Sequence, residues 1–435
     1  MREIRTAVIQ AGGKGTRLKE LTKDEIPKPL IKIAGKSILK WQIENLKSYG
    51  VEKIIIIVGY LGDEIKRCFG NGEKLGVSIE YIEESEPLGS GGSLYLLKEA
   101  DIDDDFILIY GDVMFNLNWN RMEDFHLQNK AYATLLVHPN THPFDSDLVV
   151  LNSKSQVENF LLKKQEREQW YENCVNAGVY ILSKRVVLEM EKLRKLDLEK
   201  DILIKYAGKG VLYGYHTTEY VKDAGTVERY YEVEKAFLNN IPEKRNLANK
   251  QKCIFLDRDG TLNVYKGLLA DEEDFELEDG VIQALKAINQ SEYLAIVITN
   301  QPVVARGMCE VKDVERIHRK MTTLLGNEGV YLDDIVFCPH HPDKGYAEEN
   351  VKFKIDCECR KPKTGMIDSM VSKYNIDVKQ SYMVGDTTVD IQTGINAGLT
   401  TILVHTGQAG QDKKYNISAD KQSKNFLEAV RMLLK

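Results

Sequence analysis

The chain contains 435 residues, of which 43% are hydrophobic and 29% charged, and its formal net charge is −7 at pH 7. This length predicts two or three domains of about 150 residues each, and the acidic balance argues against a nucleic-acid partner, because neutralising phosphates requires a basic face. No apolar run approaches the roughly 20 residues of a membrane span, and the chain does not open on a signal-peptide pattern. We therefore expect a cytoplasmic protein without a membrane partner, and the sequence leaves a homo-oligomer open.

A predicted strand over residues 6–10 leads into a glycine-rich loop, residues 11–18, with the sequence Ala-Gly-Gly-Lys-Gly-Thr-Arg-Leu. Glycines after a strand let backbone N–H groups approach phosphates closely. The spacing fits neither the dinucleotide fingerprint nor the P-loop. Lys14 and Arg17 lie in the loop, and Lys28 follows between two prolines that fix the backbone. Three cations around a glycine loop predict a polyphosphate site.

Further segments follow in the first part of the chain. They are Pro-Lys-Pro-Leu at 27–30, an apolar strand at 53–58, Glu-Pro-Leu-Gly-Ser-Gly-Gly at 86–92, a strand at 106–110 that leads to Asp112, Val-Asn-Ala-Gly-Val-Tyr-Ile at 175–181 and Tyr-Val-Lys-Asp-Ala-Gly-Thr at 220–226. With the glycine loop, this ordered set resembles the sugar-1-phosphate nucleotidyltransferase family. In that chemistry a sugar 1-phosphate oxygen attacks the α-phosphorus of a nucleoside triphosphate, and positioning and charge neutralisation dominate. A single Asp could be a turn residue, but the ordered set favours function.

The resemblance implies a role for each motif. Asp112 and Asp223 would hold Mg²⁺, a hard ion that takes oxygen ligands, and Arg17 and Lys28 would act as catalytic cations on the triphosphate or the sugar phosphate. Nucleotide and sugar binding would fall to Gly12, Gly13, Gly15, Thr16, Gly89, Gly91, Lys163 and Asn176.

Two positions depart from this family's pattern. Gln10 stands where the family often has Leu, and the usual Phe-x-Glu-Lys segment is Phe-Leu-Leu-Lys at 160–163, so its Glu is missing. Lys163 either keeps the phosphate-binding cation or forms a solvated pair with Lys164.

A polar stretch follows a predicted helix at 226–238. It contains a proline and several asparagines but few apolar anchors, which is typical of a linker. We therefore predict a first domain at 1–240, a linker at 241–251 and a second domain at 252–435.

The second domain begins with an apolar run at 254–256 that predicts a short buried strand. It delivers Asp257 and Asp259 to its C-terminal end, where open α/β sheets place their ligands. Asp257 can act as a covalent nucleophile toward phosphorus. Asp259, two residues on and on the same side, can serve as general acid and base. Later apolar strands end at Thr299 and at Asp386 in the same manner.

Together with Arg-Lys-Pro at 360–362, these strand ends resemble the four motifs of the haloacid dehalogenase superfamily of phosphatases. The resemblance implies that Asp257, Asp259 and Asp386 hold Mg²⁺. Thr299 and Lys361 would balance the charge on the transferring oxygens, and Asp390 would support the metal site from beside it.

A cluster of thiols and imidazoles adds a metal signal. Cys-Pro-His-His-Pro occupies 338–342 and Cys-Glu-Cys occupies 357–359. Three thiols and one imidazole make a closed zinc site of the structural type, and in a reducing compartment such a cluster favours metal over disulfides. We expect Cys338, His340, Cys357 and Cys359 as ligands, because His340 repeats the one-residue spacing, with His341 as the competitor.

The zinc loop narrows the resemblance to two groups, the heptose bisphosphate phosphatases and the histidinol-phosphate phosphatases. The orders Cys-Pro-His-His-Pro and Asp-Arg-Asp-Gly-Thr-Leu-Asn resemble the heptose group more closely. Residues 300–307 match its Asn-Gln-Ser-Gly-x-Ala-Arg-Gly loop, with Pro302 and Val303 in place of Ser and Gly. Asn300, Arg306 and Arg360 are expected to bind substrate, the arginines at a non-reacting phosphate, although each arginine could also be a surface residue.

The sequence therefore predicts an α/β fold with two Rossmann-like domains, a nucleotidyltransferase with a mixed, mostly parallel sheet and a phosphatase with a zinc loop. We expect a bifunctional enzyme of nucleotide-sugar biosynthesis, with Mg²⁺ at both active sites and structural Zn²⁺. It would remove the 7-phosphate of D-glycero-D-manno-heptose 1,7-bisphosphate and transfer GMP from GTP to the heptose 1-phosphate. The choice of GTP rests on resemblance to heptose-1-phosphate guanylyltransferases alone. The alternatives are a nucleotide-sensing N-terminal module that regulates the phosphatase, a histidinol-phosphate phosphatase fused to another transferase, and a zinc-dependent binding protein.

Overall fold

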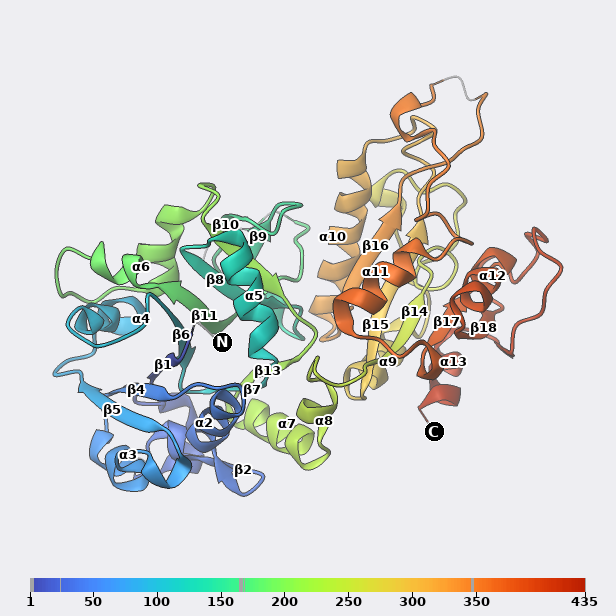
Figure 1. Cartoon of the computed structure of the whole chain (residues 1–435). Helices are drawn as coiled ribbons and strands as arrows, with labels where there is room; N and C mark the ends of the chain where they lie inside the picture. The colour runs from blue at the N-terminus through green and yellow to red at the C-terminus, as the bar shows by residue number, and fades with distance from the viewer. Residues whose placement is uncertain (1–3, 24, 164–166, 168, 346–347, 435) are drawn as a thin grey trace. The chain divides into compact units, whose positions relative to one another are not determined.

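The computed structural model describes residues 4–23, 25–163, 167, 169–345 and 348–434. They group into two compact units: the first comprises 1–138, 147–162 and 174–246, and the second comprises 139–146, 163–173 and 247–435. In Figure 1 the first unit carries mainly the blue and green segments and the second mainly the yellow to red ones. The predicted α/β architecture with two domains is confirmed.

The first unit is built on a nine-stranded mixed sheet, with the order β10-β9-β11-β6-β1-β4-β5 and with β8 joining β12 to β11. Strand β1 lies at its centre and pairs in parallel with β4 and β6, whereas β11 pairs antiparallel with β6. The strands of this sheet are β1 Thr6–Gln10, β4 Lys53–Val58, β5 Ser78–Glu83, β6 Asp105–Tyr110, β8 Ala133–His138, β9 Leu148–Leu151, β10 Val157–Leu161, β11 Val175–Ser183 and β12 Leu212–His216.

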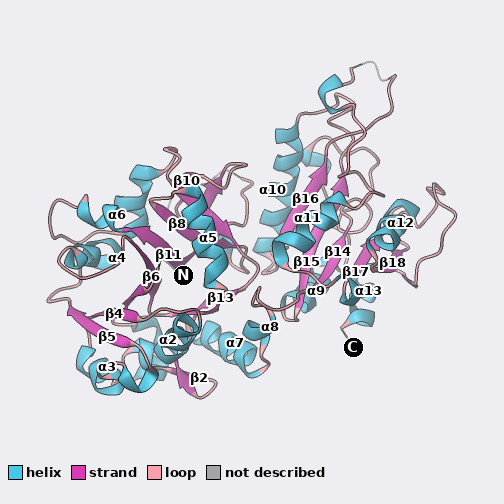
Figure 2. Cartoon of the chain, viewed as in Figure 1, coloured by secondary structure: helices cyan, strands magenta, loops and turns pink. Residues whose placement is uncertain are grey.

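Helices cover both faces of this sheet, as the cyan ribbons beside the magenta strands show (Figure 2). Alternate residues of a strand face opposite sides, so Ala7 and Ile9 enter one apolar cluster and Val8 enters the other. A strand buried on both faces is apolar throughout, which explains the run of isoleucines in β4. The helices are α1 Lys19–Thr22, α2 Ile38–Ser48, α3 Gly62–Phe69, α4 Gly89–Gly92, α5 Trp119–Asn129, α6 Lys184–Leu188, α7 Val227–Leu238 and α8 Ile241–Lys244.

Two small ribbons complete the first unit: β2 Lys32–Ile33 with β3 Lys36–Ser37, and β7 Val113–Asn116 with β13 Tyr220–Asp223. In the second ribbon Val113 pairs with Asp223, and the N–H of Ala224 donates to the carbonyl of Asp112 at 2.9 Å. This pairing brings two acidic positions together that are more than a hundred residues apart in the chain.

The second unit is a six-stranded, all-parallel sheet with the order β16-β15-β14-β17-β18-β19. Its central strands β14, β15 and β17 are almost entirely buried, since apolar clusters cover both faces. Its elements are β14 Lys252–Leu256, α9 Val281–Asn289, β15 Tyr293–Asn300, α10 Val311–Asn327, β16 Asp334–Cys338, α11 Gly365–Tyr374, β17 Tyr382–Gly385, α12 Thr388–Ala397, β18 Thr400–Val404, β19 Lys421–Ser423 and α13 Phe426–Leu433.

Two short segments of the first half of the chain, 139–146 and 163–173, are grouped with the second unit, which the sequence did not predict. Within that unit the N–H of Tyr171 donates to Thr323 Oγ1 of α10 at 2.9 Å, and the Thr323 hydroxyl lies 2.9 Å from the Tyr171 carbonyl. Lys163 begins the second of these segments, and Lys164 lies outside the described residues. The proposed boundaries 1–240, 241–251 and 252–435 stay predictions.

The stretch predicted as a linker, 241–251, is packed at its middle. In the first unit, Asn246 donates from Nδ2 to Asn116 Oδ1 at 2.7 Å. In the second unit, Leu247 is 2% exposed and joins an apolar cluster with Cys253 and Phe255. None of the helices in the described part of the chain has the length and apolarity needed to span a membrane.

Candidate active sites

The glycine loop of the first unit follows β1 and approaches Lys28, one of the cations that the sequence singled out. Gly15 has φ 61°, and a Cβ there would lie 3.1 Å from the Cβ of Lys28, so glycine permits both the turn and the approach of Lys28. Lys28 Nζ forms an ion pair with Asp112 Oδ2. At Gly12 a Cβ would lie 2.4 Å from Glu84 Oε2, whereas Gly13 has open space around it. Thr16 begins the short helix Thr16–Leu18, but its side chain lies outside the described part.

Asp223, the second predicted metal ligand of this unit, is held by a cation of its own. Arg229 Nη1, from α7, donates to both Asp223 oxygens at 3.0 Å, and the N–H of Gly225 donates to Oδ1 at 3.0 Å. A Cβ at Gly225 would lie 2.6 Å from Asp223 Oδ1 and 3.1 Å from Arg17 Nη2. The structure therefore brings Arg17 beside Asp223. Arg229 was not singled out from the sequence, because an Arg in the first turn of a helix carries no local signal.

The glycines of the segment 86–92, which are expected to bind nucleotide or sugar, form α4. A Cβ at Gly89 would lie 2.5 Å from the Leu196 carbonyl oxygen, and one at Gly91 would lie 2.9 Å from the carbonyl carbon of Asp197. A side chain at either position would clash with the backbone of residues 196–197, so packing requires these glycines in addition to the proposed binding role. Gln10, which departs from the family pattern, donates from Nε2 to the Ser90 carbonyl at 2.7 Å and to Ser93 Oγ at 2.9 Å. It connects the end of β1 to this loop.

A buried carboxylate, Glu199, lies beside the predicted sugar-side residue Asn176. One oxygen, Oε1, accepts from Asn176 Nδ2 at 2.9 Å, from the Tyr110 hydroxyl at 2.9 Å and from the Tyr180 hydroxyl. Burial raises the pKa of Glu199 to about 7, against the stabilising Tyr180 hydrogen bond. Sequence reasoning missed Glu199, because it lies in an acidic helical turn, Leu198–Ile202, that looks like an ordinary solvated segment.

Lys163 lies in the segment grouped with the second unit. Its Nζ lies 3.8 Å from Asp145 Oδ1, another residue of that unit. Its proposed phosphate-binding role stays a prediction.

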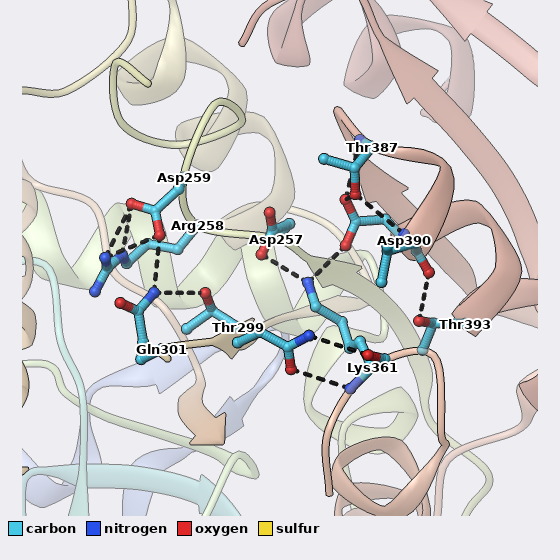
Figure 3. A network of polar contacts seen from close by, with 11 residues as sticks. Asp257, Arg258, Asp259, Thr299, Gln301, Lys361, Thr387, Asp390 and Thr393 are labelled. Atoms are coloured by element: carbon cyan, nitrogen blue, oxygen red, sulfur yellow. Dashed lines mark hydrogen bonds and ion pairs between the residues drawn. The ribbon is translucent and has the colours of Figure 1, made fainter. Parts of the chain in front are cut away.

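In the second unit, strand ends gather a cluster of carboxylates around one lysine (Figure 3). Asp257 follows β14, Asp386 follows β17 and Asp390 lies in the first turn of α12; they are 8%, 0% and 1% exposed. Lys361 Nζ donates to Asp257 Oδ1 at 2.7 Å and to Asp390 Oδ1 at 2.6 Å. Asp390 is a member of this group that the sequence placed only beside the site.

This carboxylate cluster fits a divalent cation. The ligand oxygens of Asp257, Asp386 and Asp390 all lie within 4.8 Å of one another. Burial and the Asp390 carboxylate raise the pKa of Asp257 to about 7, although Lys361 opposes the shift. Burial, with Asp257 and Asp390, raises the pKa of Asp386 to about 8. Asp386 Oδ1 is buried without a hydrogen-bond partner in the described part of the chain. Such crowded, desolvated oxygens suit a hard cation.

Asp259 projects away from this cluster toward a different set of partners. Arg258 Nη2 donates to both of its oxygens at 2.9 Å, Gln301 Nε2 donates to Oδ2 at 2.8 Å and Asn263 Nδ2 donates to Oδ1 at 3.1 Å. Asp259 is not in the carboxylate group that the structure brings together, so its role as a metal ligand stays a prediction.

Thr299 and Asn300, at the end of β15, link the residues around Asp259 to those around Lys361. Gln301 donates to Thr299 Oγ1 at 2.9 Å. The Asn300 side chain binds both main-chain groups of Lys361, with Lys361 N to Oδ1 at 3.0 Å and Nδ2 to the Lys361 carbonyl at 3.1 Å. Asn300 thereby fixes the backbone that carries the lysine amine to Asp257.

The four side chains expected to bind zinc lie together. Their sulfur atoms are 3.1 to 3.5 Å apart, and His340 Nδ1 is 3.3 Å from Cys359 Sγ and 3.6 Å from Cys338 Sγ. A tetrahedral zinc with bonds of about 2.3 Å to sulfur requires sulfur–sulfur edges of about 3.8 Å, so the cluster is close to the size needed. His341 turns elsewhere, since its Nδ1 accepts from the Asp343 N–H at 3.2 Å. The structure thus holds a possible Cys/His metal site with His340, rather than His341, as the fourth member.

The two arginines proposed for a second phosphate lie beside this cluster. Arg360 Nη1 donates to the His340 carbonyl at 2.9 Å. Burial and then Arg360 lower the pKa of His341 to about 4, and Arg306 acts in the same direction. A Cβ at Gly307 would lie 1.7 Å from the Glu348 carbonyl oxygen. Only glycine therefore lets the chain after Arg306 pack against the loop between Cys338 and Cys359.

Comparisons with known proteins identify the family of each unit. Residues 6–240 match the nucleotidyl transferase family, and residues 358–429 match the HAD-hydrolase-like family. The D-glycero-beta-D-manno-heptose-1,7-bisphosphate 7-phosphatase of Yersinia pestis is 42% identical over 157 residues, 36% of this chain and 81% of that protein. The Escherichia coli K12 protein of the same name is 40% identical over 163 residues, 37% of this chain and 83% of that protein. The chain belongs to the nucleotidyl transferase family and to the heptose bisphosphate 7-phosphatase family. The predicted fusion of the two is confirmed, and the chain is a bifunctional enzyme.

Two solved structures are also similar to parts of this nucleotidyltransferase–phosphatase. HddC from Yersinia pseudotuberculosis, which has also been crystallised with GMP-PN, is 28% identical and covers 54% of this chain and 100% of its own, with a TM-score of 0.47. A D,D-heptose 1,7-bisphosphate phosphatase from B. bronchiseptica, complexed with magnesium and phosphate, is 29% identical and covers 42% of this chain and 98% of its own, with a TM-score of 0.38.

Proposed function

We propose that the phosphatase unit removes the 7-phosphate of heptose 1,7-bisphosphate, and that the nucleotidyltransferase unit then joins the heptose 1-phosphate to GMP from GTP, releasing pyrophosphate. The observation that carries the proposal is the pairing of the strand-end site around Asp257 and Lys361 with 42% identity to a heptose bisphosphate 7-phosphatase, in one chain with a nucleotidyltransferase. The choice of GTP rests on the sequence resemblance alone.

In the phosphatase unit, Asp257 attacks phosphorus while Lys361 holds its carboxylate in place. The bond between phosphorus and the sugar oxygen breaks, and Asp259 gives a proton to that oxygen. Asp259 then takes a proton from water, which attacks the aspartyl phosphate and releases phosphate. Thr299 and Lys361 face the transferring oxygens at the carboxyl end of the parallel strands, where α/β folds place ligands.

Asp257, Asp386 and Asp390 would hold the cation of this site. Bound Mg²⁺ would shield the negative charge of the nucleophile from the incoming phosphate. Arg306 and Arg360 would bind the phosphate that does not react, because both are cations beside the metal loop.

In the nucleotidyltransferase unit, Lys28 and Arg17 would neutralise the phosphates around the glycine loop. Asp112 and Asp223, brought together by the pairing of β7 with β13, would hold a second Mg²⁺. That ion would supply charge neutralisation at the α-phosphate. Asn176 and Glu199 offer an amide and a carboxylate for sugar hydroxyls.

Cys338, His340, Cys357 and Cys359 would hold zinc. The four ligands leave no open coordination position, so a zinc there would stabilise the fold of the loop rather than take part in the reaction.

A one-pot assay tests the proposal. The chain is supplied with either anomer of heptose 1,7-bisphosphate, Mg²⁺ and one nucleoside triphosphate at a time, while phosphate, pyrophosphate and nucleotide-heptose are followed. We expect phosphate in every reaction, and pyrophosphate with GDP-heptose in the GTP reaction. If another triphosphate yields nucleotide-heptose and GTP yields none, the assignment of guanine as the nucleobase would be wrong. Phosphate without any nucleotide-heptose would favour a nucleotide-sensing first unit or a different sugar, and faster hydrolysis of histidinol phosphate would overturn the heptose assignment.

Two further expectations stay predictions: the cytoplasmic location and a possible homo-oligomer.

A further inference from the structure

Arg258, the residue between the two catalytic carboxylates, is 0% exposed. Its Nη2 and Nε donate to the Asp259 carboxylate, with Nη2 at 2.9 Å from both oxygens and Nε at 3.2 Å from Oδ1. Its Nη1 lies 3.2 Å from Nε2 of His318. A buried guanidinium that leaves a donor unsatisfied is costly, so the partner of Nη1 has structural consequences.

The hydrogen bond to His318 fixes the state of the imidazole. Arg is always protonated and can only donate, so Nε2 must be the acceptor and the ring must be neutral, with its proton on Nδ1. Burial and the Arg258 charge lower the pKa of His318 well below its ordinary value, in agreement with the geometry.

His318 reaches this position from α10, far from any sequence motif of the site. It is 7% exposed, and its ring packs edge-on against Phe337 of β16, with 5.3 Å between ring centroids. A buried histidine is often only a satisfied core residue. Here, however, the single acceptor of the ring accepts from Arg258, the arginine that donates to the Asp259 carboxylate. A residue that only fills the core does not need this hydrogen bond.

The guanidinium is planar, and its donors form a rigid fork. Asp259 occupies one side of the fork and His318 occupies another, so the plane of the guanidinium is set from both sides. Without His318, Arg258 keeps its charge but its fork is fixed from the Asp259 side alone. The orientation of the Asp259 carboxylate then depends more on its hydrogen bonds from Gln301 and Asn263.

We propose that His318 is a positioning residue of the phosphatase, which fixes the Arg258 fork and thereby orients the Asp259 carboxylate for proton transfer. The inference rests on the phosphatase half of the proposed function. In that reaction Asp257 forms a bond to phosphorus, the bond to the sugar oxygen breaks, and the proton of Asp259 goes to that oxygen. A sugar alkoxide is a poor leaving group and needs the proton, whereas p-nitrophenolate leaves without it.

The test compares these two leaving groups in the full-length enzyme. For His318→Leu we expect turnover of heptose 1,7-bisphosphate to fall about 10- to 100-fold, a part of the roughly 100- to 10,000-fold effect of a general acid. We expect the first-turnover burst of p-nitrophenolate from p-nitrophenyl phosphate to change less than about 3-fold, because that bond breaks without the acid.

Two amide variants form a matched pair. His318→Gln places an amide oxygen near the position of Nε2 and should recover heptose bisphosphate turnover to within about 5-fold of wild type, whereas His318→Asn is too short to reach Arg258 and should behave like the Leu variant. Phe337→Leu is the packing control, because it alters the contact with the ring but keeps the hydrogen bond. It should lower the melting temperature and leave the ratio of the two substrates unchanged.

Equal losses with both substrates in His318→Leu and His318→Asn, or no difference between the Gln and Asn variants, would make His318 a structural residue. If the Leu variant does not fold, Arg258→Lys tests the same step, since it keeps the charge but loses the fork. If wild-type enzyme gives the p-nitrophenolate burst but does not hydrolyse heptose bisphosphate, the proposed substrate fails. The inference is then decided by the same ratio, measured with whichever primary alkyl phosphate the enzyme does hydrolyse.

Discussion

The two candidate active sites differ in how deeply their carboxylates are buried and in how these pair with cations. In the phosphatase unit three carboxylates, Asp257, Asp386 and Asp390, lie together and are almost completely buried. Two of them, Asp257 and Asp390, share one lysine, Lys361. In the nucleotidyltransferase unit Asp112 and Asp223 are 28% and 31% exposed, and each is paired with its own cation, Lys28 and Arg229.

The difference fits the chemistry proposed for each site. A carboxylate that must attack phosphorus is useful only if it is desolvated and held beside its partners, which concentrates negative charge until a cation arrives. A site that mainly positions two phosphorylated substrates can remain balanced, pair by pair. We therefore expect the phosphatase site to depend more strongly on its own carboxylate and its metal than the transferase site does.

The largest expected effect is on the nucleophile. Asp257→Asn should lower phosphate release by about 1,000-fold or more, because an amide cannot form the aspartyl phosphate. Formation of nucleotide-heptose from preformed heptose 1-phosphate should change less than about 2-fold, since that reaction uses other residues. Both activities are measured on the same preparation, with bound metal checked. A parallel loss of both would contradict two separate sites.

The corresponding change in the other unit should cost less. Asp112→Asn should lower nucleotide-heptose formation about 100- to 1,000-fold, through weaker charge neutralisation at the α-phosphate, and leave phosphate release unchanged. The measurement is pyrophosphate release at several Mg²⁺ concentrations. Asp63, whose side chain is 91% exposed, provides a control of the same kind through Asp63→Asn, which should retain activity. An Asp112→Asn enzyme with near wild-type activity would remove Asp112 from the metal site.

Loss of the Cys/His cluster should affect stability rather than chemistry. Cys359→Ser should release the metal and lower the stability of the phosphatase unit by at least about 2 kcal/mol, because a closed metal site contributes folding energy. Thermal unfolding and metal content are followed together, with Cys68→Ser at an exposed position as control. Unchanged metal content and unfolding would show that the cluster is not a metal site.

A smaller effect concerns Glu199 and carries a pH signature. Since the pKa of Glu199 rises from 4.5 to about 7 on folding, the folded unit keeps a proton that the unfolded chain loses. Stability should therefore decline as the pH rises from about 4.5 to 7, by about 3 kcal/mol for this group, and then level off. In Glu199→Gln that part of the decline should disappear, and the KM for heptose 1-phosphate should rise about 10-fold with the loss of a charged acceptor. Chemical denaturation across this pH range, with wild type in parallel, gives the answer; identical slopes would refute the assignment.

The smallest expected effect is at Gln10. Gln10→Leu restores the residue common in the family but removes two hydrogen bonds to the α4 loop. We expect the KM for the nucleoside triphosphate to rise about 2- to 5-fold, as for loss of one net hydrogen bond, with the kcat nearly constant. A change in kcat alone would indicate that Gln10 influences the reacting phosphates rather than the α4 loop.

Much of the candidate phosphatase site could be predicted from the sequence, because three of its side chains lie at the ends of apolar strands. Carboxyl ends of parallel strands meet at one edge, so Asp257, Thr299 and Asp386 were expected together. Local spacing also favoured His340 over His341. The four expected zinc ligands come from two short segments, and in each segment one residue separates the two ligands. Such spacing can be recognised from the sequence alone.

Other contacts could be decided only by the tertiary structure. Three residues of the candidate sites lie in helices and helical turns, where any polar residue has an ordinary surface explanation and no local signal separates the two: Arg229, Glu199 and His318. Asp390 was expected only beside the metal site, and packing brought its carboxylate into the group with Asp257 and Asp386. The grouping of 139–146 and 163–173 with the second unit was equally invisible, since it depends on what a loop meets after folding. The sequence by itself determined the strands, the fused families and the strand-end chemistry, because these depend on short-range pattern. Which cation pairs with which carboxylate, and which buried histidine contacts Arg258, was decided by packing between segments distant in the chain.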